Sequence, residues 1–332
     1  MSIPAKAAAP KTHGYWKTDM LGKTAGGLYW MFRFLERAEN TARLIEAGFR
    51  IALTRSNDAE SEWKSVIITS AAQQAFEARH DKYSSANVVN FLLRDPEHPS
   101  SVLSVTKSAR DNARLVRTAL TTEVWAAVNE TWMVLTETLK RPIPETELPA
   151  VLATIRQQSA LVRGALVGTM LRNDIFDFCR LGTFVERIDS TARIIDVKYY
   201  ALLPAPSFVG SRMDNVQWET ILRSVSAHRS FRWAVEDDFT APAIADFLIL
   251  DDRMPRSLSH CAAQLVNNLG HLAKDYGEAM PSHALADRMN ARLKDRDIGS
   301  IFDEGLHEFV GSILRENAAI GMQIEIDYRF NY

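Results

Sequence analysis

Two short segments of the chain each combine a glutamate with two arginines at the same spacing, and these residues are the clearest candidates for chemistry. In each segment one arginine follows the glutamate directly and a second lies seven positions after it, about two turns of a helix. Guanidinium groups bind carboxylates or phosphates through paired hydrogen bonds, and a glutamate can transfer a proton. We therefore expect a polar seam where the segments face each other, which either holds an anionic substrate or fixes the segments by ion pairs. The six residues are Glu36, Arg37, Arg43, Glu186, Arg187 and Arg193.

A row of three arginines in the middle of the chain is the second candidate, here for a partner or an anion. Arg110, Arg114 and Arg117 follow one another at spacings of four and three, which places them on one face of a helix. Such a face can dock an acidic partner or substrate, and it can equally form salt bridges with neighbouring acidic helices.

The sequence offers no convincing metal, cofactor or nucleophile motif. Two Glu-x-x-His pairs, Glu77 with His80 and Glu304 with His307, have the spacing used in di-iron bundles. They do not occupy corresponding places in the two similar halves described below, so we interpret them as chance. The two cysteines stand in no metal-ligand spacing. We expect no metal and no cofactor on this chain.

Composition excludes several classes of protein. The chain has 332 residues, 46% of them hydrophobic, with 39 Lys and Arg against 41 Asp and Glu, a balance that indicates neither nucleic-acid nor membrane binding. Only 15 glycines and 12 prolines occur, which favours an all-α fold. The first residues lack the apolar core of a secretory signal, and no apolar run is long enough to span a membrane, so we expect a cytoplasmic location.

The two Glu-Arg segments belong to a longer internal similarity. Residues 34–46 and 184–196 align at a constant offset of 150, with seven of thirteen positions identical. A second block follows in the same order, with residues 91–101 matching 247–257 at an offset of 156. This predicts an internally duplicated helical bundle with two related halves.

The duplication and the breaker residues suggest a division of the chain into five parts. We expect a flexible N-terminus (1–17), a first helical repeat (18–140), a linker (141–147), a second helical repeat (148–319) and a short extended or β-like C-terminal tail (320–332). The tail alternates apolar and polar residues, the period of a strand. A strand must pair, so it either adds to another chain, as in a homodimer, or lies on its own core.

The same blocks resemble the alpha-E domain family, bacterial all-helical proteins with a glutamate-arginine motif. Two positions depart from the family pattern: Phe32 stands where glycine is expected, and Thr183 stands where a basic residue is common. The resemblance covers nearly the whole chain from Met20 to about Ala319. It is carried by residues 28–45, 109–129, 178–195 and 247–261.

The resemblance implies a context rather than a mechanism. The resemblance implies that proteins of this family accompany circularly permuted ATP-grasp ligases and transglutaminase-like peptidases, in systems that form or modify amide bonds in peptides. ATP and magnesium would then belong to the partner ligase, and a peptide would be the substrate. The family assigns no catalytic role to the Glu-Arg motif.

Two functions from different classes follow. The first is an accessory or scaffold subunit that binds an ATP-grasp partner and does no bond chemistry alone. The second is an enzyme or ligand-binding protein whose Glu/Arg seam holds a carboxylate or phosphate, with arginine as the anchor and glutamate as acid or base.

Overall fold

The computed structural model describes residues 20–54, 59–201, 212–235 and 239–330, and this part of the chain folds into helices and turns without any strand. The all-α prediction is therefore confirmed, whereas the expected flexible N-terminus lies outside the described residues. In chain order the elements are α1 (Gly22–Thr54), α2 (Ala59–Thr69), α3 (Gln73–Glu77), α4 (Ser85–Arg94), α5 (Val102–Leu115), the 3-10 turn η1 (Arg117–Ala119), α6 (Thr122–Thr138), α7 (Leu148–Thr169), α8 (Asp174–Ala201), α9 (Arg212–Ser224), α10 (His228–Ala234), α11 (Ala241–Ile249), α12 (Leu258–Tyr276), α13 (Pro281–Lys294), α14 (Ile298–Glu304) and α15 (Leu306–Asp327).

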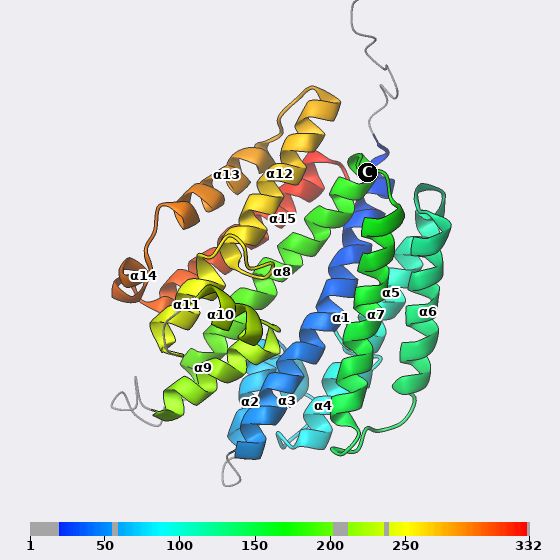
Figure 1. The fold of residues 1–332 in the computed structure, drawn as a ribbon. Coiled ribbons are helices and arrows are strands. Elements are labelled where there is room, and N and C mark those ends of the chain that lie inside the picture. Colours follow the sequence, from blue (N-terminus) through cyan, green and yellow to red (C-terminus); the bar gives the residue numbers. More distant parts are fainter. Residues whose placement is uncertain (1–19, 55–58, 202–211, 236–238, 331–332) are drawn as a thin grey trace, which may run out of the picture.

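Helices α1 and α8, which carry the two Glu-Arg segments, pack against each other in the centre of the molecule (Figure 1). Their backbones come into direct contact, because a Cβ atom added at Gly182 in α8 would lie 2.1 Å from the carbonyl oxygen of Tyr29 in α1. Only glycine leaves room for so close an approach. Phe32, the corresponding residue of α1, is instead buried in the apolar core.

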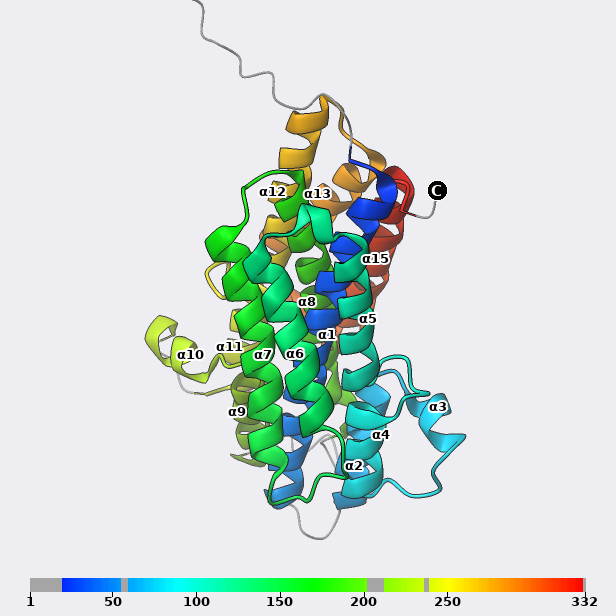
Figure 2. The same ribbon diagram turned by 90° about the vertical axis from the view of Figure 1, so that its right-hand side faces the viewer.

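The other helices flank this central pair in two groups with similar neighbours. Helices α5 and α7 pack on α1 and are joined by α6, and these form a layer in front of the centre in Figure 2. Helices α12 and α15 pack on α8 and are joined by α13. Helices α2 and α9 each contact both members of the central pair. The two Glu-Arg segments are thus enclosed on several sides.

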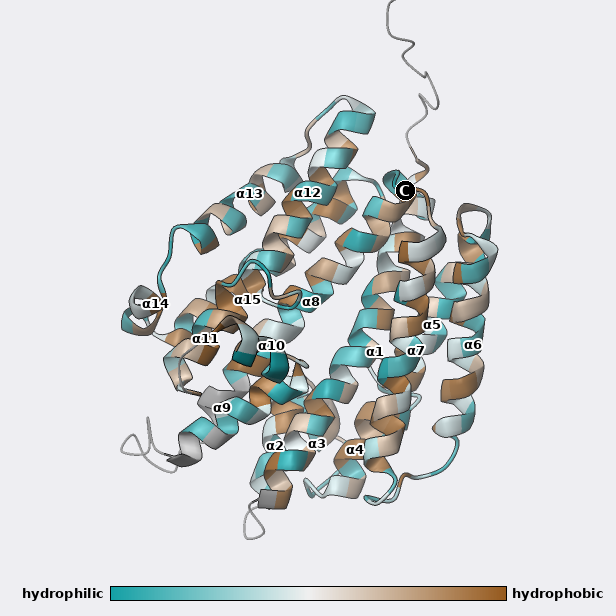
Figure 3. Ribbon diagram, in the orientation of Figure 1, coloured by the Kyte–Doolittle hydropathy of each residue, from teal (hydrophilic) through white to brown (hydrophobic). Residues whose placement is uncertain are grey.

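Apolar side chains form two buried clusters that meet along α1. The larger cluster takes residues 25–35 of α1 together with most of the second half of the chain, and the smaller takes residues 38–51 with α2 to α5. Brown and teal stretches alternate along most of the helices in Figure 3, as amphipathic packing requires. None of the described helices combines the length and the apolar character that crossing a membrane requires. Glu36 and Arg37 therefore lie at the junction of the two clusters along α1.

The predicted extended tail is wrong, because residues 320–327 continue helix α15. The buried side chains of this helix include Ile313, Ile320 and Ile324, at helical spacing, whereas Met322 is 62% and Ile326 64% exposed. A segment with an apolar residue at every second position also has one at every fourth position, and residues four apart lie on the same face of a helix. Packing against α8 and α13 selects the helical alternative.

Substitutions along α15 distinguish the two conformations. Ile324→Ala should lower the free energy of unfolding by about 2–5 kcal/mol, since it leaves a cavity in the core. Met322→Ala and Ile326→Ala, the matched controls, should change it by less than about 0.5 kcal/mol because their side chains are exposed. Urea denaturation followed by circular dichroism measures all three, and equal losses at the three positions would contradict the helix.

Candidate functional site

The two Glu-Arg segments exchange their charges across the contact between α1 and α8. Arg187 donates from Nε and Nη2 to the two carboxylate oxygens of Glu36, at 3.1 and 3.0 Å. In the reciprocal pair, Arg37 donates from Nε and Nη2 to the carboxylate of Glu186, at 2.5 and 2.9 Å. Both pairs are bidentate, the strongest geometry for a guanidinium and a carboxylate. The predicted seam between the segments therefore exists as crossed ion pairs.

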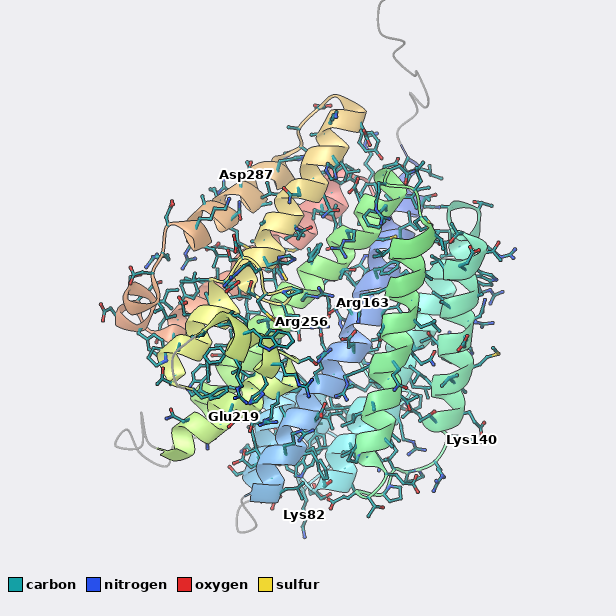
Figure 4. The ribbon with its side chains drawn as sticks, viewed as in Figure 1. Lys82, Lys140, Arg163, Glu219, Arg256 and Asp287 are labelled. Carbon is teal, nitrogen blue, oxygen red and sulfur yellow. The ribbon has the colours of Figure 1, made fainter. Side chains whose placement is uncertain are left out.

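The Glu36 side of the seam is a closed network, which we call the Glu36 cluster. Arg256 bridges its two carboxylates, with Nη1 2.9 Å from Glu36 and Nη2 2.6 Å from Glu39. Arg163 of α7 also contacts both glutamates, and Arg43 donates to Glu39 at 2.6 Å. Figure 4 shows Arg163 and Arg256 at the centre of the molecule, beside α1. The cluster consists of Glu36, Glu39, Arg43, Arg163, Arg187 and Arg256.

Electrostatics keeps both carboxylates of the Glu36 cluster charged. Burial alone would raise the pKa of Glu36, which is 2% exposed, but Arg187, Arg256 and Arg163 outweigh it and hold that pKa far below its usual range. The pKa of Glu39 is lowered for the same reason. Burial lowers the pKa of Arg256 to about 10, so this side chain is still protonated at neutral pH. A carboxylate held in this way cannot serve as a general acid at neutral pH, and the cluster acts as a fixed clamp between helices.

The Glu186 side of the seam is open and borders a cavity of about 350 Å³. Glu186 accepts from Arg37 and, at 3.0 Å, from Nε of Arg33, while Asp189 pairs with Arg193 at 2.7 Å. Burial would raise the pKa of Glu186, but Arg37 and Arg33 lower it below the usual value. We call this space the Glu186 cavity. Its polar lining includes Arg37, Asn40, His98, Glu186, Asp189 and Arg193.

The structure places the predicted seam residues in two groups. Glu36, Arg43 and Arg187 belong to the Glu36 cluster, whereas Arg37, Glu186 and Arg193 line the Glu186 cavity. Arg43 contacts Glu39, four residues away, and additionally donates to the backbone carbonyl of Ser224 at 2.9 Å. Arg193 pairs with Asp189 at the same spacing of four residues.

Sequence reasoning missed the two arginines that close the Glu36 cluster. Arg163 is distinguished in the sequence only as a charge that interrupts the apolar stretch 161–171, and Arg256 only as the residue after Pro255. An arginine inside an apolar stretch is a usable signal, because a buried charge requires a partner. Nothing in the sequence identified Glu36 and Glu39 as its partners.

The predicted arginine row does not lie on a single helix. Helix α5 ends at Leu115, so Arg117 belongs to the separate turn η1. Arg110 is half-buried and donates from Nε to Asn129 at 2.8 Å, and the guanidinium of Arg117 lies 5.1 Å from the centre of the Trp125 ring. Arg114 and Arg117 are exposed. These two remain available to an acidic partner.

The cysteines and the remaining acidic groups do not form a catalytic centre among the described residues. Cys179 and Cys261 are fully buried, and burial raises the pKa of Cys261 to about 12, so little reactive thiolate is present at neutral pH. Burial also raises the pKa of Asp177 to about 6 beside His271, whose Nδ1 lies 3.1 Å away. Within the described ranges no three His, Cys, Asp or Glu side chains gather as metal ligands.

The chain matches a known family and several known proteins over nearly its whole length. The family model Alpha-E, described as a predicted alpha-helical domain with a conserved ER motif, matches residues 20–328. Uncharacterised proteins of Mycobacterium bovis and of Mycobacterium tuberculosis strains CDC 1551 and H37Rv are each 22% identical to the chain over 337 residues. These matches cover 95% of the chain but 37% of each relative, so the chain spans little more than a third of their length. No solved structure matches the chain.

Removal of one carboxylate tests whether the Glu36 cluster is a structural clamp. Glu36→Gln leaves Arg187 and Arg256 buried without their main counter-charge, so the free energy of unfolding should fall by about 3–5 kcal/mol. The matched control is Glu137→Gln, because Glu137 forms an exposed pair with Lys140 at 3.6 Å, and it should cost less than about 1 kcal/mol. A loss at Glu36 no larger than the control's would contradict a structural role.

The same cluster should make stability depend on acidity. The pKa values of Glu36 and Glu39 are lower in the folded chain than the ordinary value of 4.5. Below about pH 5 the unfolded chain takes up protons that the folded chain does not, so stability falls as the pH falls. Glu36→Gln should reduce the slope of unfolding free energy with pH, between about pH 3 and 4, by up to about 1.4 kcal/mol per unit. Urea titrations at several pH values measure this slope, and a slope unchanged from wild type would refute the assignment.

Proposed function

Because the chain belongs to the Alpha-E family of helical domains, we propose that it is an accessory or scaffold subunit of a system that forms or modifies amide bonds in peptides. Its principal partner would be a circularly permuted ATP-grasp ligase, which binds the ATP and magnesium. A transglutaminase-like protein would be a second partner of the same system. The chain itself would position a partner or a peptide and perform no bond chemistry.

The observation that carries this proposal is the length of the relatives. The chain aligns over 95% of its own length but over 37% of each relative. In those proteins the helical unit therefore belongs to a longer polypeptide and works next to further sequence. A unit that is joined to other chain segments in its relatives is suited to work in contact with another protein.

The geometry of the seam favours a supporting role over catalysis. Glu36 receives hydrogen bonds or ion pairs from three arginines, and Glu186 from two. Both pKa values are lowered, so neither carboxylate holds a proton to donate at neutral pH. The alternative, an enzyme that uses these glutamates as acid and base, lacks an available proton donor at the seam.

The exposed arginines at the end of α5 suit a docking role in this proposal. Arg114 and Arg117 lie close in sequence on an exposed part of the surface, and Leu115 between them is 82% exposed. Cations around an exposed apolar side chain complement an acidic surface with an apolar centre. We therefore assign the partner contact to this end of the layer formed by α5, α6 and α7.

We also propose that the chain arose by duplication of one helical unit, with α1 to α7 and α8 to α15 as the two copies. Two local details support this. Ser159 of α7 donates to the carbonyl of Leu35 at 3.4 Å, and Asn317 of α15 donates to the carbonyl of Val185, 150 positions after Leu35, at 2.8 Å. The turns after α2 and α9 both contain a residue with positive φ, Ala71 (55°) and Ser226 (57°). In this proposal α7 belongs to the first copy and α15 to the second.

A reconstitution experiment tests the accessory role. The purified chain should form a complex with an ATP-grasp ligase from the same organism, detected by light scattering after size exclusion, and should raise peptide-dependent ADP release several-fold while releasing none alone. The double variant Arg114→Glu with Arg117→Glu should weaken the complex, and Arg288→Glu, an exposed change on α13, should not. Absence of a complex, together with full ligase activity without the chain, would overturn the proposal.

A further inference from the structure

The two sides of the seam differ at one loop position, which determines whether the space beside it is filled. The loops before α5 and α12 have the same internal bonds, since Asp95 accepts from the backbone of Glu97 at 2.9 Å and Asp251 from that of Arg253 at 2.8 Å. Each loop ends in a serine cap, Ser101 for α5 and Ser257 for α12. The residue just before the cap is Ser100 in one loop and Arg256 in the other.

This difference explains the Glu186 cavity. The guanidinium of Arg256 reaches into the Glu36 cluster and fills the space between its two carboxylates. Ser100, at the corresponding position, lines the cavity together with Glu186 and Asp189, and its short side chain carries no guanidinium that could bridge them. The volume of about 350 Å³ lies within the range of about 300–1,000 Å³ that small-molecule sites occupy.

Three residues of the cavity lining each carry a buried polar atom without a hydrogen-bond partner within the described part of the chain: Nδ2 of Asn40, Oγ1 of Thr69 and Nδ1 of His98. Their residues are only 6%, 6% and 7% exposed. The orientation of the Asn40 amide is determined by Arg256, which can only donate and lies 3.0 Å from Oδ1. Nδ2 is therefore an obligate donor without an acceptor, which is costly unless a ligand supplies one.

The charges around the cavity favour an anionic group. Three guanidinium groups line it, those of Arg33, Arg37 and Arg193, against the two carboxylates of Glu186 and Asp189. Each carboxylate is already engaged, Glu186 by two arginines and Asp189 by Arg193. The charged side chains that line the cavity thus sum to one positive charge, and Asn40 lines the same cavity.

Other residues that line the cavity indicate further chemical groups that a ligand would carry. Leu44, Leu92 and Ile194 form an apolar part of the wall, where an aliphatic group of a ligand would be buried. Burial lowers the pKa of His98, so at neutral pH the ring is uncharged and Nδ1 can accept a hydrogen bond from an N–H group.

We propose that the Glu186 cavity binds the carboxylate of an amino acid or short peptide, with Asn40 and the neighbouring arginines as donors and the aliphatic wall around the side chain. All the lining residues belong to this chain, so such binding does not depend on a ligase partner. It can therefore fail or succeed independently of the accessory function.

Calorimetric titration of the full-length chain with N-acetyl-leucine tests the site. This probe carries a carboxylate, an N–H group and an aliphatic side chain, and it should bind with a Kd below about 1 mM. N-acetyl-leucinamide, which lacks the carboxylate, should bind at least about tenfold more weakly. L-Argininamide is the cationic comparison, because a guanidinium fills the corresponding space in the Glu36 cluster.

Ser100→Arg is the decisive variant, because it places a guanidinium where Arg256 has one. It should abolish binding of N-acetyl-leucine while the chain keeps its helical content and thermal stability. Ser61→Arg, an exposed change on α2, adds the same charge elsewhere and should leave binding intact. If Ser100→Arg does not fold, Thr69→Val tests the site instead, since it removes an unpaired hydroxyl with little change in volume and should weaken binding.

Three results would overturn the proposal. One is the absence of N-acetyl-leucine binding to the wild-type chain at about 10 mM. Another is equal or tighter binding of the amide or of L-argininamide, which would make the cavity a site for a neutral or cationic group. The last is undiminished binding by a folded Ser100→Arg variant, or by Thr69→Val where that variant is the one tested.

Discussion

The structure depends on the crossed ion pairs between α1 and α8. Each helix gives its glutamate to the arginine of the other, Glu36 to Arg187 and Glu186 to Arg37, and both glutamates are buried. A buried charge without its partner is very costly, so the two helices can pack in only one axial position and rotation. The close backbone contact at Gly182 brings the helices near enough for both pairs to form. The flanking helices then pack on a central pair whose geometry is already determined.

The Glu36 side and the Glu186 side of the seam contain similar residues, but one is enclosed and the other borders a cavity because their neighbours differ. On one side Arg163 and Arg256 arrive from α7 and from the loop before α12, and the carboxylates of Glu36 and Glu39 are completely enclosed. On the other side Ser100 replaces the loop arginine, and the charges of Glu186 and Asp189 border an open space. Arg256 and Arg163 together therefore separate a structural clamp from a cavity. Polar atoms left unpaired at that cavity, above all Nδ2 of Asn40, mark it as the side where a ligand would be stabilised.

Much of the fold and part of the site could be predicted from the sequence, for physical reasons that differ between residues. A polar seam between the two segments could be expected because two segments with the same spacing repeat at an offset of 150, but the crossed partners could not be read from that spacing. The conformation of residues 320–327 was not, because alternation at Ile320, Met322 and Ile324 satisfies both a strand and one face of a helix, and only packing against α8 selects between them. Arg163 and Arg256 were missed because they reach α1 through tertiary structure, from more than 100 residues away. The interruption of the arginine row at Leu115 likewise follows from a helix end that residue types did not indicate.

A buried charged seam is a costly way to join two helices, and its position suggests what it contributes. Apolar side chains alone would tolerate several alternative packings of two long helices, since hydrophobic contacts are not directional. The charges lie where the two apolar clusters meet along α1, so they interrupt an interface that could otherwise slide. The resemblance between the two segments adds a further ambiguity, because either segment could in principle take the other's place. Arg163 and Arg256 remove that ambiguity, since only the Glu36 side is enclosed by them. Specificity of packing, rather than added stability, is the physical reason for such a cluster.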